Sequence, residues 1–369
     1  MKIGFVLDDT LDTTDGVQQY VLLVGGWLKR QGHDVHYLVG HSTRKDVDNI
    51  HSLARNVRVS FNKNRLSVPL PASTRAIKNL LNAEKFDVLH IQMPFSPFLA
   101  GKIIRHAPIE TAIVGTFHVA PHGKNVTFGT RVLAMVQRAN IEKIDRIMSV
   151  SQVAKQFALN TQNIKSTVVP NAIDTKMWQS SKVVKRKYDI VFVGRLVSRK
   201  GCIYLLRALK SLANLQDISK LKVAIVGDGP EREVLEQYAK VNNLSRICTF
   251  EGYVSEDKKK QILRSSKLAV FPSTGGESFG IVLIEAMAAG TTVLAGNNPG
   301  YNTVLGALPE VLFTPQNIKE LADSLFTMLN DQATLNMIHA AQQKILKRYD
   351  IDIVGNAILK IYKEAIASK

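Results

Sequence analysis

Two glutamates in one glycine-rich stretch are the residues of this chain best suited to chemistry. Glu277 and Glu285 have seven residues between them in the segment GGESFGIVLIEAMAAG, residues 275–290. Carboxylates accept hydrogen bonds from sugar hydroxyls. Two glutamates alone are more often ordinary helix residues, one serving the helix dipole and one solvated, so the residues around them decide between the two interpretations.

These surrounding residues predict a strand, a loop and the start of a helix. Residues 267–271, KLAVF, are apolar after the initial lysine and predict a buried strand, and the following helix is expected to open on Gly280. The first amides of a helix lack intrahelical partners, and the helix dipole favours an anion there. We therefore expect a phosphate against Gly280, Ile281 and Val282. A diphosphate bound there leaves one glutamate near each end of the ligand, which predicts a nucleotide-sugar site.

Two cations follow another predicted strand, at residues 190–193. The next segment, GRLVSRKG at 194–201, carries Arg195 and Lys200. At an effective dielectric near 20, each cation close to a diphosphate contributes roughly 4 kcal/mol before desolvation. Such a pair makes a metal ion unnecessary. The alternative is an ordinary basic surface loop.

The first half of the chain offers a glycine and a histidine next to predicted strands. Gly16 precedes the predicted helix at 17–29 and can bring its backbone against a phosphate, although glycine at such a turn is also common for steric reasons. His118 follows the strand predicted at 112–117. A histidine there can position a sugar hydroxyl or help proton transfer, and the alternative is an ordinary loop residue.

No metal site is expected. His118 and His122 have the spacing of a ligand pair but no third ligand nearby. The aspartates at 8–9 precede the glycine turn, and those within 350–352 open the last predicted helix, where acids serve the dipole.

The whole chain has room for two domains. It has 369 residues, of which 45% are hydrophobic. Apolar segments alternate with helical stretches, which indicates an α/β fold. The strands are predicted at 3–7, 35–39, 86–91, 112–117, 146–150 and 168–169, then at 190–193, 223–226, 248–250, 268–271 and 292–294.

Two Rossmann-like halves are therefore expected, joined by a polar and basic connection. We place the N-terminal domain at 1–170, the connection at 171–187, the C-terminal domain at 188–348 and a final helical segment at 349–369. Ligands of such folds lie beyond the carboxyl ends of the strands. Two facing halves predict a cleft between them.

The net charge of +17 indicates an anionic partner, namely a phosphorylated substrate, an acidic membrane surface or nucleic acid. Between Asp48 and Glu84 the chain has no acidic residue. The basic residues there are Arg55, Arg58, Lys63, Arg65, Arg75 and Lys78. A solvated face is the alternative interpretation. Only 7% of the residues are aromatic, which disfavours a nucleic-acid binder.

The cellular location of the protein is predicted from features that the sequence lacks. The start MKIGFVLDD has no long apolar core of a signal peptide, and no run of about 18 apolar residues occurs. Cys202 and Cys248 fit no disulfide framework, so both are expected to be reduced and buried. We expect a cytoplasmic protein.

Together these segments resemble the retaining glycosyltransferases of family four, also called group 1, which have the GT-B fold. The resemblance covers nearly the whole chain. Its motifs are GGESFGIVLIEAMAAG, GRLVSRKG, VGDGPE at 226–231 and VVPNAID at 168–174. Within the family, the chain looks most like the bacterial branch that mannosylates phosphatidylinositol, through DGVQQ, DVLHIQMP at 87–94 and TFH at 116–118.

The resemblance implies a role for each donor-site residue. Glu285 would bind the ribose hydroxyls and Glu277 the transferred sugar. Arg195 and Lys200 would bind the diphosphate, and Gly16 would touch phosphate from the other domain. The chain departs from the family in having an aspartate, at position 15, where a second glycine is usual.

The resemblance also implies an acceptor side. His118 would sit by the sugar and help hold the acceptor, and the final helix would return to the N-terminal domain. The basic stretch falls where the mannosylating branch has a basic amphipathic helix for anionic lipid. Residues expected to face the acceptor or a membrane are Lys63, Arg65, Arg75, Lys78, His122 and Lys124.

The sequence therefore predicts a metal-independent retaining glycosyltransferase without a cofactor, peripheral to the inner face of the cell membrane. The expected reaction transfers mannose from GDP-mannose to a lipid such as phosphatidylinositol. The alternative is a UDP-glucose-dependent glucosyltransferase acting on diacylglycerol or on a soluble or polysaccharide acceptor. More remote alternatives are a nucleotide-sugar epimerase, which shares the two-domain fold, and a nucleic-acid-binding protein. The sequence does not indicate the oligomeric state.

Overall fold

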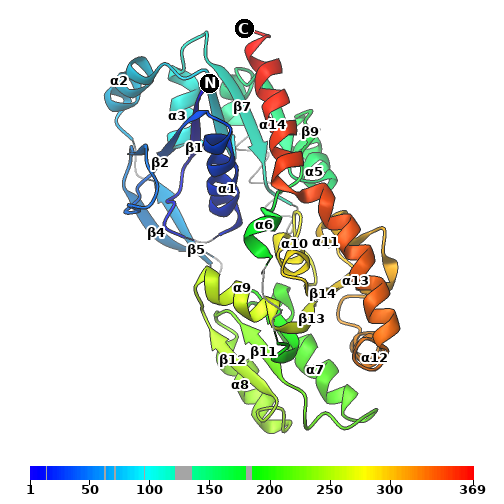
Figure 1. Cartoon of the computed structure of the whole chain (residues 1–369). Helices are drawn as coiled ribbons and strands as arrows, with labels where there is room; N and C mark the ends of the chain where they lie inside the picture. The colour runs from blue at the N-terminus through cyan, green and yellow to red at the C-terminus, as the bar shows by residue number, and fades with distance from the viewer. Residues whose placement is uncertain (14, 62–63, 70–71, 95, 121–134, 180–184) are drawn as a thin grey trace. The chain divides into compact units, whose positions relative to one another are not determined.

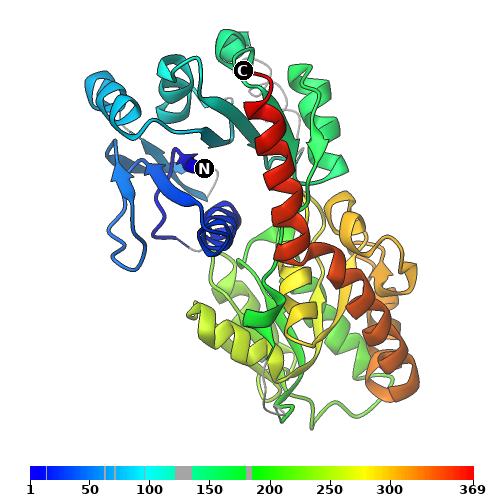
Figure 2. The ribbon, with the colours of Figure 1, turned by 45° about the horizontal axis from the view of Figure 1, so that its top comes forward.

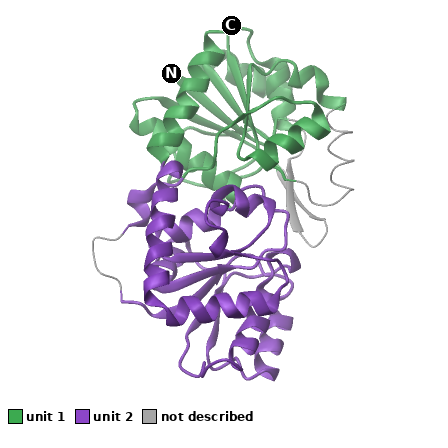
Figure 3. Ribbon diagram, turned by 90° about the vertical axis from the view of Figure 1, so that its right-hand side faces the viewer, with its two compact units in different colours: residues 1–172, 351–369 green, residues 173–350 purple. Residues whose placement is uncertain are grey.

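The computed structural model describes residues 1–369 except 14, 62–63, 70–71, 95, 121–134 and 180–184, and for 56–61 and 64–69 it describes the backbone alone. The described chain divides into two compact units. Unit 1 comprises residues 1–172 and 351–369, and unit 2 comprises residues 173–350 (Figure 3). Each unit is built on its own parallel sheet.

Unit 1 contains a seven-stranded parallel sheet in the order β3-β2-β1-β6-β7-β8-β9 (Figure 1). Its strands are β1 Lys2–Leu7, β2 Asp34–Val39, β3 Ile50–Ser52, β6 Val88–Gln92, β7 Ala112–Phe117, β8 Arg146–Ser149 and β9 Thr167–Val168. A separate two-stranded antiparallel sheet is formed by β4 Asn56–Phe61 and β5 Asn64–Pro69. The parallel strands are nearly continuous apolar runs because helices cover both faces.

Helices from both ends of the chain cover one face of this sheet. The helices of unit 1 whose bounds lie within the described residues are α1 Gly16–Arg30, α2 Thr74–Glu84, α3 Leu99–His106, α5 Gln152–Gln162 and α14 Ile351–Ile366, and residues 135–141 are helical as well. Side chains of α1 and α14 share one core with alternate residues of β1, β6 and β7. Side chains of α2 and α3 form the core on the other face. The two views in Figures 1 and 2 agree that α14 runs alongside this sheet.

Unit 2 repeats the architecture with a six-stranded parallel sheet in the order β12-β11-β10-β13-β14-β15. Its strands are β10 Tyr188–Val193, β11 Val223–Val226, β12 Cys248–Gly252, β13 Ser266–Phe271, β14 Thr292–Gly296 and β15 Leu312–Phe313. Its helices are α6 Thr175–Trp178, α7 Cys202–Leu212, α8 Arg232–Val241, α9 Glu256–Arg264, α10 Ile281–Ala288, α11 Pro299–Leu305, α12 Ile318–Asn330 and α13 Gln332–Leu346. Short 3₁₀ turns occupy Ser198–Lys200, Pro309–Val311 and Lys347–Tyr349.

The strand order in each sheet reverses direction at one point. The first strand of unit 1, β1, pairs with β2 on one side and with β6 on the other. In unit 2, β10 likewise pairs with β11 and with β13. Connections leave such a pair of central strands in opposite directions, which opens a crevice at their carboxyl ends. The loops after β1, β6, β10 and β13 are therefore where each unit can hold a ligand.

The predicted α/β class with two parallel sheets is confirmed, and the long apolar strands fall close to their predicted positions. Strands β3 and β15, and the β4–β5 hairpin, were not predicted. Strand β15 has only two residues, and β3 has three half-exposed or exposed ones, so neither has the apolar run that indicates a strand. Within the described residues, no helix is long and apolar enough to cross a membrane.

Candidate active site

Two loops meet at the carboxyl end of β10 and β13 in unit 2. Thr274 N–H and Ser273 Oγ each donate to the carbonyl of Arg199, both at 2.9 Å. Gly201 has a φ of +71°, and a Cβ there would lie 2.1 Å from the carbonyl oxygen of Pro272. This contact between backbones requires glycine. The loop of the GRLVSRKG segment is thereby fixed against the loop that carries Glu277.

Glu277 is the centre of a compact ion-pair cluster. Its Oε1 accepts from Arg199 Nη1 at 2.9 Å and lies 2.9 Å from Lys200 Nζ, and its Oε2 lies 3.1 Å from the same ammonium. Ser273 Oγ lies 3.0 Å from Oε1. The Glu277 side chain is 10% exposed and that of Lys200 is 15% exposed. These contacts fix the orientation of the Glu277 carboxylate between the two loops.

The charges of this cluster favour an anionic ligand. Burial alone would raise the pKa of Glu277, but the charges of Lys200 and Arg199 hold that pKa below its ordinary value. Burial lowers the pKa of Lys200; Glu277 opposes this effect, whereas the positive charges of Arg199 and Arg195 add to it. Arg195 itself is exposed at the end of β10. Two cations thus contact one carboxylate, with Arg195 adding a third positive charge near Lys200, and a bound phosphate would balance the excess.

The start of helix α10 lies directly after this loop. Gly280 caps the helix with a φ of +107°, and the helix runs from Ile281 to Ala288. Its first amides are the ones expected to face a phosphate, because they have no intrahelical acceptor. A Cβ at Gly280 would lie 2.7 Å from the ring of Tyr301, so glycine is needed both for the left-handed backbone and for space.

Glu285 is buried one turn into α10, at 4% exposure. It is therefore not a solvated helix residue. Lys259 of α9 pairs with it at 3.0 Å and with Glu256 at 2.8 Å, and the same ammonium lies 5.6 Å from the centre of the Trp178 ring. Burial raises the pKa of Glu285, and the charge of Lys259 opposes that rise.

Helix α11 locks the Glu277 loop from the other side. Asn298 caps this helix by accepting from Tyr301 N–H at 3.0 Å, and its amide donates to the Ser273 carbonyl at 3.2 Å. A Cβ at Gly300 would lie 2.1 Å from the carbonyl oxygen of Glu277. The segment around Asn298 is therefore part of the support of the site.

Unit 1 brings a second group of polar residues to the carboxyl ends of its central strands. Gly16 opens helix α1 and is exposed. The preceding Asp15 occupies the N-cap position, is exposed, and makes no side-chain capping bond. Gln18, which is 3% exposed, donates to Asp9 at 3.2 Å. The backbone at Gly16 is thus open to a ligand.

His118 follows β7 and is partly exposed. Its Nε2 lies 2.8 Å from Gln92 Oε1, and the ring of Tyr20 meets it edge-on at 5.2 Å between centroids. Burial lowers the pKa of His118 below its ordinary value near 6.5. The imidazole is therefore neutral at neutral pH and acts as a hydrogen-bonding group.

Sequence comparison connects this geometry with a family. The family description "Glycosyl transferases group 1" matches residues 174–345, and "Glycosyltransferase Family 4" matches residues 14–177. The phosphatidyl-myo-inositol mannosyltransferase of Mycobacterium tuberculosis strain H37Rv is 30% identical over 380 residues, which cover 100% of this chain and 98% of that protein. The protein of the same name from Mycolicibacterium smegmatis is 31% identical, covering 98% and 94%. This chain belongs to glycosyltransferase family 4.

Solved structures show the fold of the glycosyltransferase. A glycosyltransferase from Rickettsia africae superposes with a TM-score of 0.76 at 18% identity, covering 100% of this chain and 99% of that one. An Anabaena protein in complex with UDP and glucose superposes with a TM-score of 0.75 at 16% identity, covering 98% and 99%. The predicted GT-B architecture of two Rossmann-like domains is confirmed.

The residues predicted to face a membrane are only partly described. Arg75 and Lys78 are exposed on helix α2 of the glycosyltransferase. Lys63, His122 and Lys124 lie outside the described residues, and Arg65 is described by its backbone alone, in β5. Of the residues predicted to face the acceptor or a membrane, the structure therefore describes the side chains of Arg75, Lys78 and His118.

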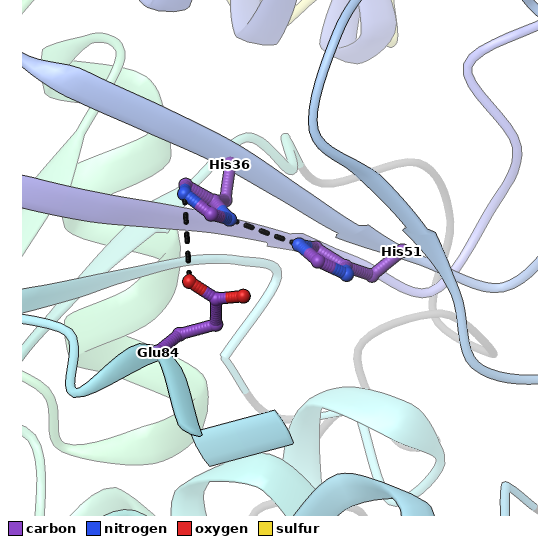
Figure 4. A group of neighbouring side chains, drawn as sticks. All are labelled: His36, His51 and Glu84. Carbon is purple, nitrogen blue, oxygen red and sulfur yellow. Dashed lines mark hydrogen bonds and ion pairs between the residues drawn. The ribbon is translucent and has the colours of Figure 1, made fainter. Parts of the chain in front are cut away.

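One cluster in the glycosyltransferase has metal-ligand chemistry. Among the residues that the structure describes, His36, His51 and Glu84 bring ligand atoms within 4.8 Å of one another (Figure 4). His36 Nδ1 lies 2.9 Å from His51 Nε2, whereas its opposite nitrogen lies 3.2 Å from Asp34 and 3.8 Å from Glu84. Lys2 Nζ lies 2.9 Å from Glu84 and 3.4 Å from Asp34. Because an ammonium already fills the space between the carboxylates, we assign no metal to this cluster.

The two aspartate pairs considered as metal ligands have structural contacts in the glycosyltransferase. Asp8 accepts from Ala100 N–H at 2.7 Å and from Ser96 Oγ. Asp350 accepts from Thr175, and Asp352 accepts from the indole of Trp27 at 2.7 Å. These carboxylates accept hydrogen bonds from other segments of the chain, which is a structural role.

Several residues of the site were missed from the sequence. Arg199 stands next to Lys200 in a segment that was recognised, so its charge was a usable signal. Lys259 lies on α9, far from Glu285 in sequence, and Gln92 lies on a different strand from His118. No local pattern indicates these two contacts, because tertiary packing creates them.

Proposed function

We propose that this glycosyltransferase transfers a hexose, mannose from GDP-mannose, to phosphatidylinositol at a membrane surface, with retained anomeric configuration. The observation that carries the proposal is the cluster in which Lys200 and Arg199 hold Glu277 beside the start of α10. The names of the relatives that match the full chain support the mannosyl donor and the inositol lipid acceptor.

The donor diphosphate binds between the loop after β10 and the start of α10. Arg195 and Lys200 supply positive charge, and the amides of Gly280, Ile281 and Val282 supply hydrogen-bond donors. Glu285 accepts from the ribose hydroxyls. It lies one turn into the helix, where Lys259 at 3.0 Å opposes the effect of burial on its charge.

Glu277 accepts from hydroxyls of the transferred sugar. When phosphate draws the Lys200 ammonium toward itself, Arg199 and Ser273 keep the carboxylate oriented, because they contact its Oε1 at 2.9 and 3.0 Å. A carboxylate tied to two cations is a weak nucleophile, so Glu277 binds hydroxyls and does not attack the anomeric carbon.

The transfer step breaks the bond from the anomeric carbon to the diphosphate oxygen and forms the bond from that carbon to the acceptor hydroxyl oxygen. The acceptor attacks from the face that the diphosphate leaves, and its proton passes to a departing phosphate oxygen. Lys200, Arg195 and the α10 amides stabilise the charge that develops on the leaving group. Because His118 is neutral, it supports this step by hydrogen bonding to sugar and acceptor hydroxyls.

A second candidate is glucosyl transfer from UDP-glucose to diacylglycerol or to another acceptor. The Anabaena protein of similar fold was solved with UDP and glucose and, in another structure, with UDP-glucose, which makes this donor the alternative to test. The residues assigned above bind the diphosphate and the ribose, which the two donors share. Base and sugar must therefore be decided by experiment.

The test is a matrix of donors and acceptors with the purified protein. GDP-mannose and UDP-glucose are each combined with vesicles containing phosphatidylinositol or diacylglycerol, with and without EDTA, and the lipids are analysed by mass spectrometry and NMR. The proposal expects mannosyl-phosphatidylinositol with the donor's anomeric configuration and no effect of EDTA. Product only from UDP-glucose would support the second candidate, and no lipid product from any combination would refute both.

A further inference from the structure

Two side-chain hydrogen bonds join β6 and β7 near their carboxyl ends in unit 1. His90 Nε2 lies 2.6 Å from Thr116 Oγ1, and Gln92 Oε1 lies 2.8 Å from His118 Nε2. Alternate residues of a strand share one face of the sheet. His90 and Gln92 are therefore neighbours on one face of β6. Thr116 lies on β7 and His118 directly after it, two residues further on, so the two bonds are successive rungs.

The rest of this face holds the rungs in place. Tyr362 of α14 places its hydroxyl 2.7 Å from His90 Nδ1, and the ring of Tyr20 meets the rings of both His90 and His118 edge-on. His90 is fully buried, and Gln92 is 1% exposed. Neighbours on three elements thus fix the His90 and His118 rings, and Gln92 is buried beside them with its carbonyl oxygen against His118.

The contact with His118 is the hydrogen bond of the Gln92 amide that the described residues show. Its Nε2 is buried and has no hydrogen-bond partner among the described residues. An unpaired buried donor costs about 1–3 kcal/mol, and each such group in a folded protein calls for an explanation. Its carbonyl oxygen, by contrast, lies 2.8 Å from Nε2 of His118, the residue directly after β7.

A carbonyl oxygen accepts hydrogen bonds and cannot donate one. His118 Nε2 must therefore carry a proton to make the 2.8 Å contact with Gln92. A neutral imidazole has one proton, so Nδ1 of His118 is left with a lone pair. That nitrogen can accept a hydrogen bond from a hydroxyl, and the ring orientation is set from behind by Gln92.

We propose that Gln92 is a positioning residue for glycosyl transfer: it fixes His118 in the Nε2–H tautomer, so that Nδ1 accepts a hydrogen bond from a substrate hydroxyl. The inference deepens the proposed function, on which it rests for the place of His118 beside the sugar. Gln92 acts through His118 and does not itself touch substrate.

The direct test reads the tautomer in the full-length protein without substrate. Histidines are labelled with ¹⁵N, and the His118 signals are assigned from their loss in His118→Gln. We expect a neutral Nε2–H ring between pH 6 and pH 8, and a mixture of tautomers in Gln92→Met, which keeps the side-chain length but lacks the carbonyl. An Nδ1–H ring in the wild type, or the same tautomer in Gln92→Met, would overturn the assignment. This readout stays valid even if the donor or acceptor proposed above is wrong.

A kinetic test separates positioning from stability. Gln92→Met should lower kcat about 10- to 100-fold, the size of effect expected when a group that assists the reaction is no longer oriented. The dissociation constant of the donor should stay within about twofold of wild type. Gln92→Glu places a carboxylate at Nε2, which favours the imidazolium. Its kcat should rise with pH as the ring loses its proton, whereas the wild-type kcat should show no such ionisation. A wild-type kcat in Gln92→Met would refute the inference.

Thr116→Val is the matched control, because it removes the neighbouring rung, together with the hydrogen bond from Thr116 to Tyr20, and leaves the Gln92 and His118 side chains unchanged. We expect it to lower the melting temperature, since His90 Nε2 loses its partner, without changing the His118 tautomer or the pH profile of kcat. If Thr116→Val changes the His118 tautomer as Gln92→Met does, packing of the face sets the ring and the role of Gln92 is refuted.

Discussion

At the scale of single residues, the two glutamates of the α10 region are buried in opposite electrostatic environments. Glu277 meets two cations and has its pKa lowered, whereas burial dominates at Glu285 and raises its pKa. Glu277 is thereby held charged by its own protein. At Glu285 burial disfavours the charged form, and the charge of Lys259 opposes this effect.

Replacing Glu277 by Gln should lower kcat/KM about 100-fold, which corresponds to about 2.7 kcal/mol of lost transition-state stabilisation. The amide cannot accept from sugar hydroxyls while also balancing Lys200 and Arg199. Steady-state kinetics of sugar transfer measure the effect. Glu310→Gln, an exposed glutamate in the same unit, is the control and should behave as wild type. Equal activity of the two variants would remove Glu277 from the site.

The opposite pKa shifts predict opposite dependences of stability on pH. The lowered pKa of Glu277 contributes stability above its unfolded value near 4.5, and this contribution is lost as pH falls through the folded value. The raised pKa of Glu285 gives the reverse: its contribution is complete below about 4.5 and is lost as pH rises through the folded value.

Urea unfolding at pH 4 and pH 7 measures these contributions in the Gln variants. Relative to wild type, Glu277→Gln should lose stability between pH 4 and pH 7, and Glu285→Gln should gain it. The common wild-type reference is the control for all other titrating groups. If the two variants change in the same direction, one of the two environments has been misassigned.

At the scale of elements, the site depends on three loops whose backbones touch. The loops after β10 and β13 share hydrogen bonds at Arg199, and the start of α11 closes against Glu277. Parallel strands bring these loops to one edge of the sheet, and the glycines allow them to approach. Enlarging a side chain at these contacts should therefore displace the loops and weaken donor binding.

Gly300→Ala tests this dependence, since its Cβ would lie 2.1 Å from the Glu277 carbonyl oxygen. We expect the variant to lose about 1–3 kcal/mol of stability and to bind nucleoside diphosphates more weakly, as measured by urea unfolding and calorimetry. Gly26→Ala, inside α1, is the matched control, because its Cβ meets only Arg30 Nη1 at 4.0 Å. It should gain about 0.5–1 kcal/mol from helix propensity. Wild-type stability and binding in Gly300→Ala would contradict the packing described here.

Helix α2 carries exposed basic residues, from which we predict binding to anionic membranes. It buries Ile77 and Leu81 in unit 1 and leaves Arg75 and Lys78 exposed. At about 1 kcal/mol per basic residue near an anionic surface, replacing both by Gln should weaken binding to phosphatidylinositol-rich vesicles roughly 30-fold at low salt. Co-sedimentation measures the binding. The control replaces Lys220 and Lys222, exposed in unit 2, and equal loss in the two variants would show that only net charge matters.

The elements show what the sequence could and could not predict. Strands such as β1, β7 and β13 are long apolar runs in parallel sheets, and these are readable. The hairpin β4–β5 and the edge strand β15 lack such runs. In the candidate site, Glu277, Lys200 and Gly280 could be predicted because they lie in short motifs of the sequence, and their functional roles stay predictions. The partners Lys259 and Gln92 come from other elements, so only the folded structure reveals them.

At the scale of the whole molecule, the two ends of the chain belong to one unit. Helix α14 at the C-terminus packs with α1 against the unit 1 sheet, and the contacts of Trp27 with Asp352 and of His90 with Tyr362 fix it there. Unit 2 is therefore an insertion between the two parts of unit 1. The stability of unit 1 therefore depends on a helix at the C-terminal end of the chain.

A chain ending at Asp350 should lose the fold of unit 1 and keep that of unit 2. Removing α14 exposes apolar side chains of α1, β6 and β7 that α14 covers, and uncovering apolar area costs about 25 cal/mol per Å². Limited proteolysis with mass spectrometry should show early cuts within residues 1–172 and protection within 173–350. The full chain is the control, and equal protection of both parts in the truncated chain would contradict the division.

The central claim is that this family 4 glycosyltransferase moves a sugar from a nucleoside diphosphate to a lipid hydroxyl. The most direct measurement counts released nucleoside diphosphate and glycolipid in one reaction of the wild-type protein with GDP-mannose, with and without phosphatidylinositol vesicles. We predict equal amounts of both products with vesicles, and little nucleotide release without them. Rapid nucleotide release that is independent of any acceptor, or no release from any nucleotide sugar, would contradict the claim.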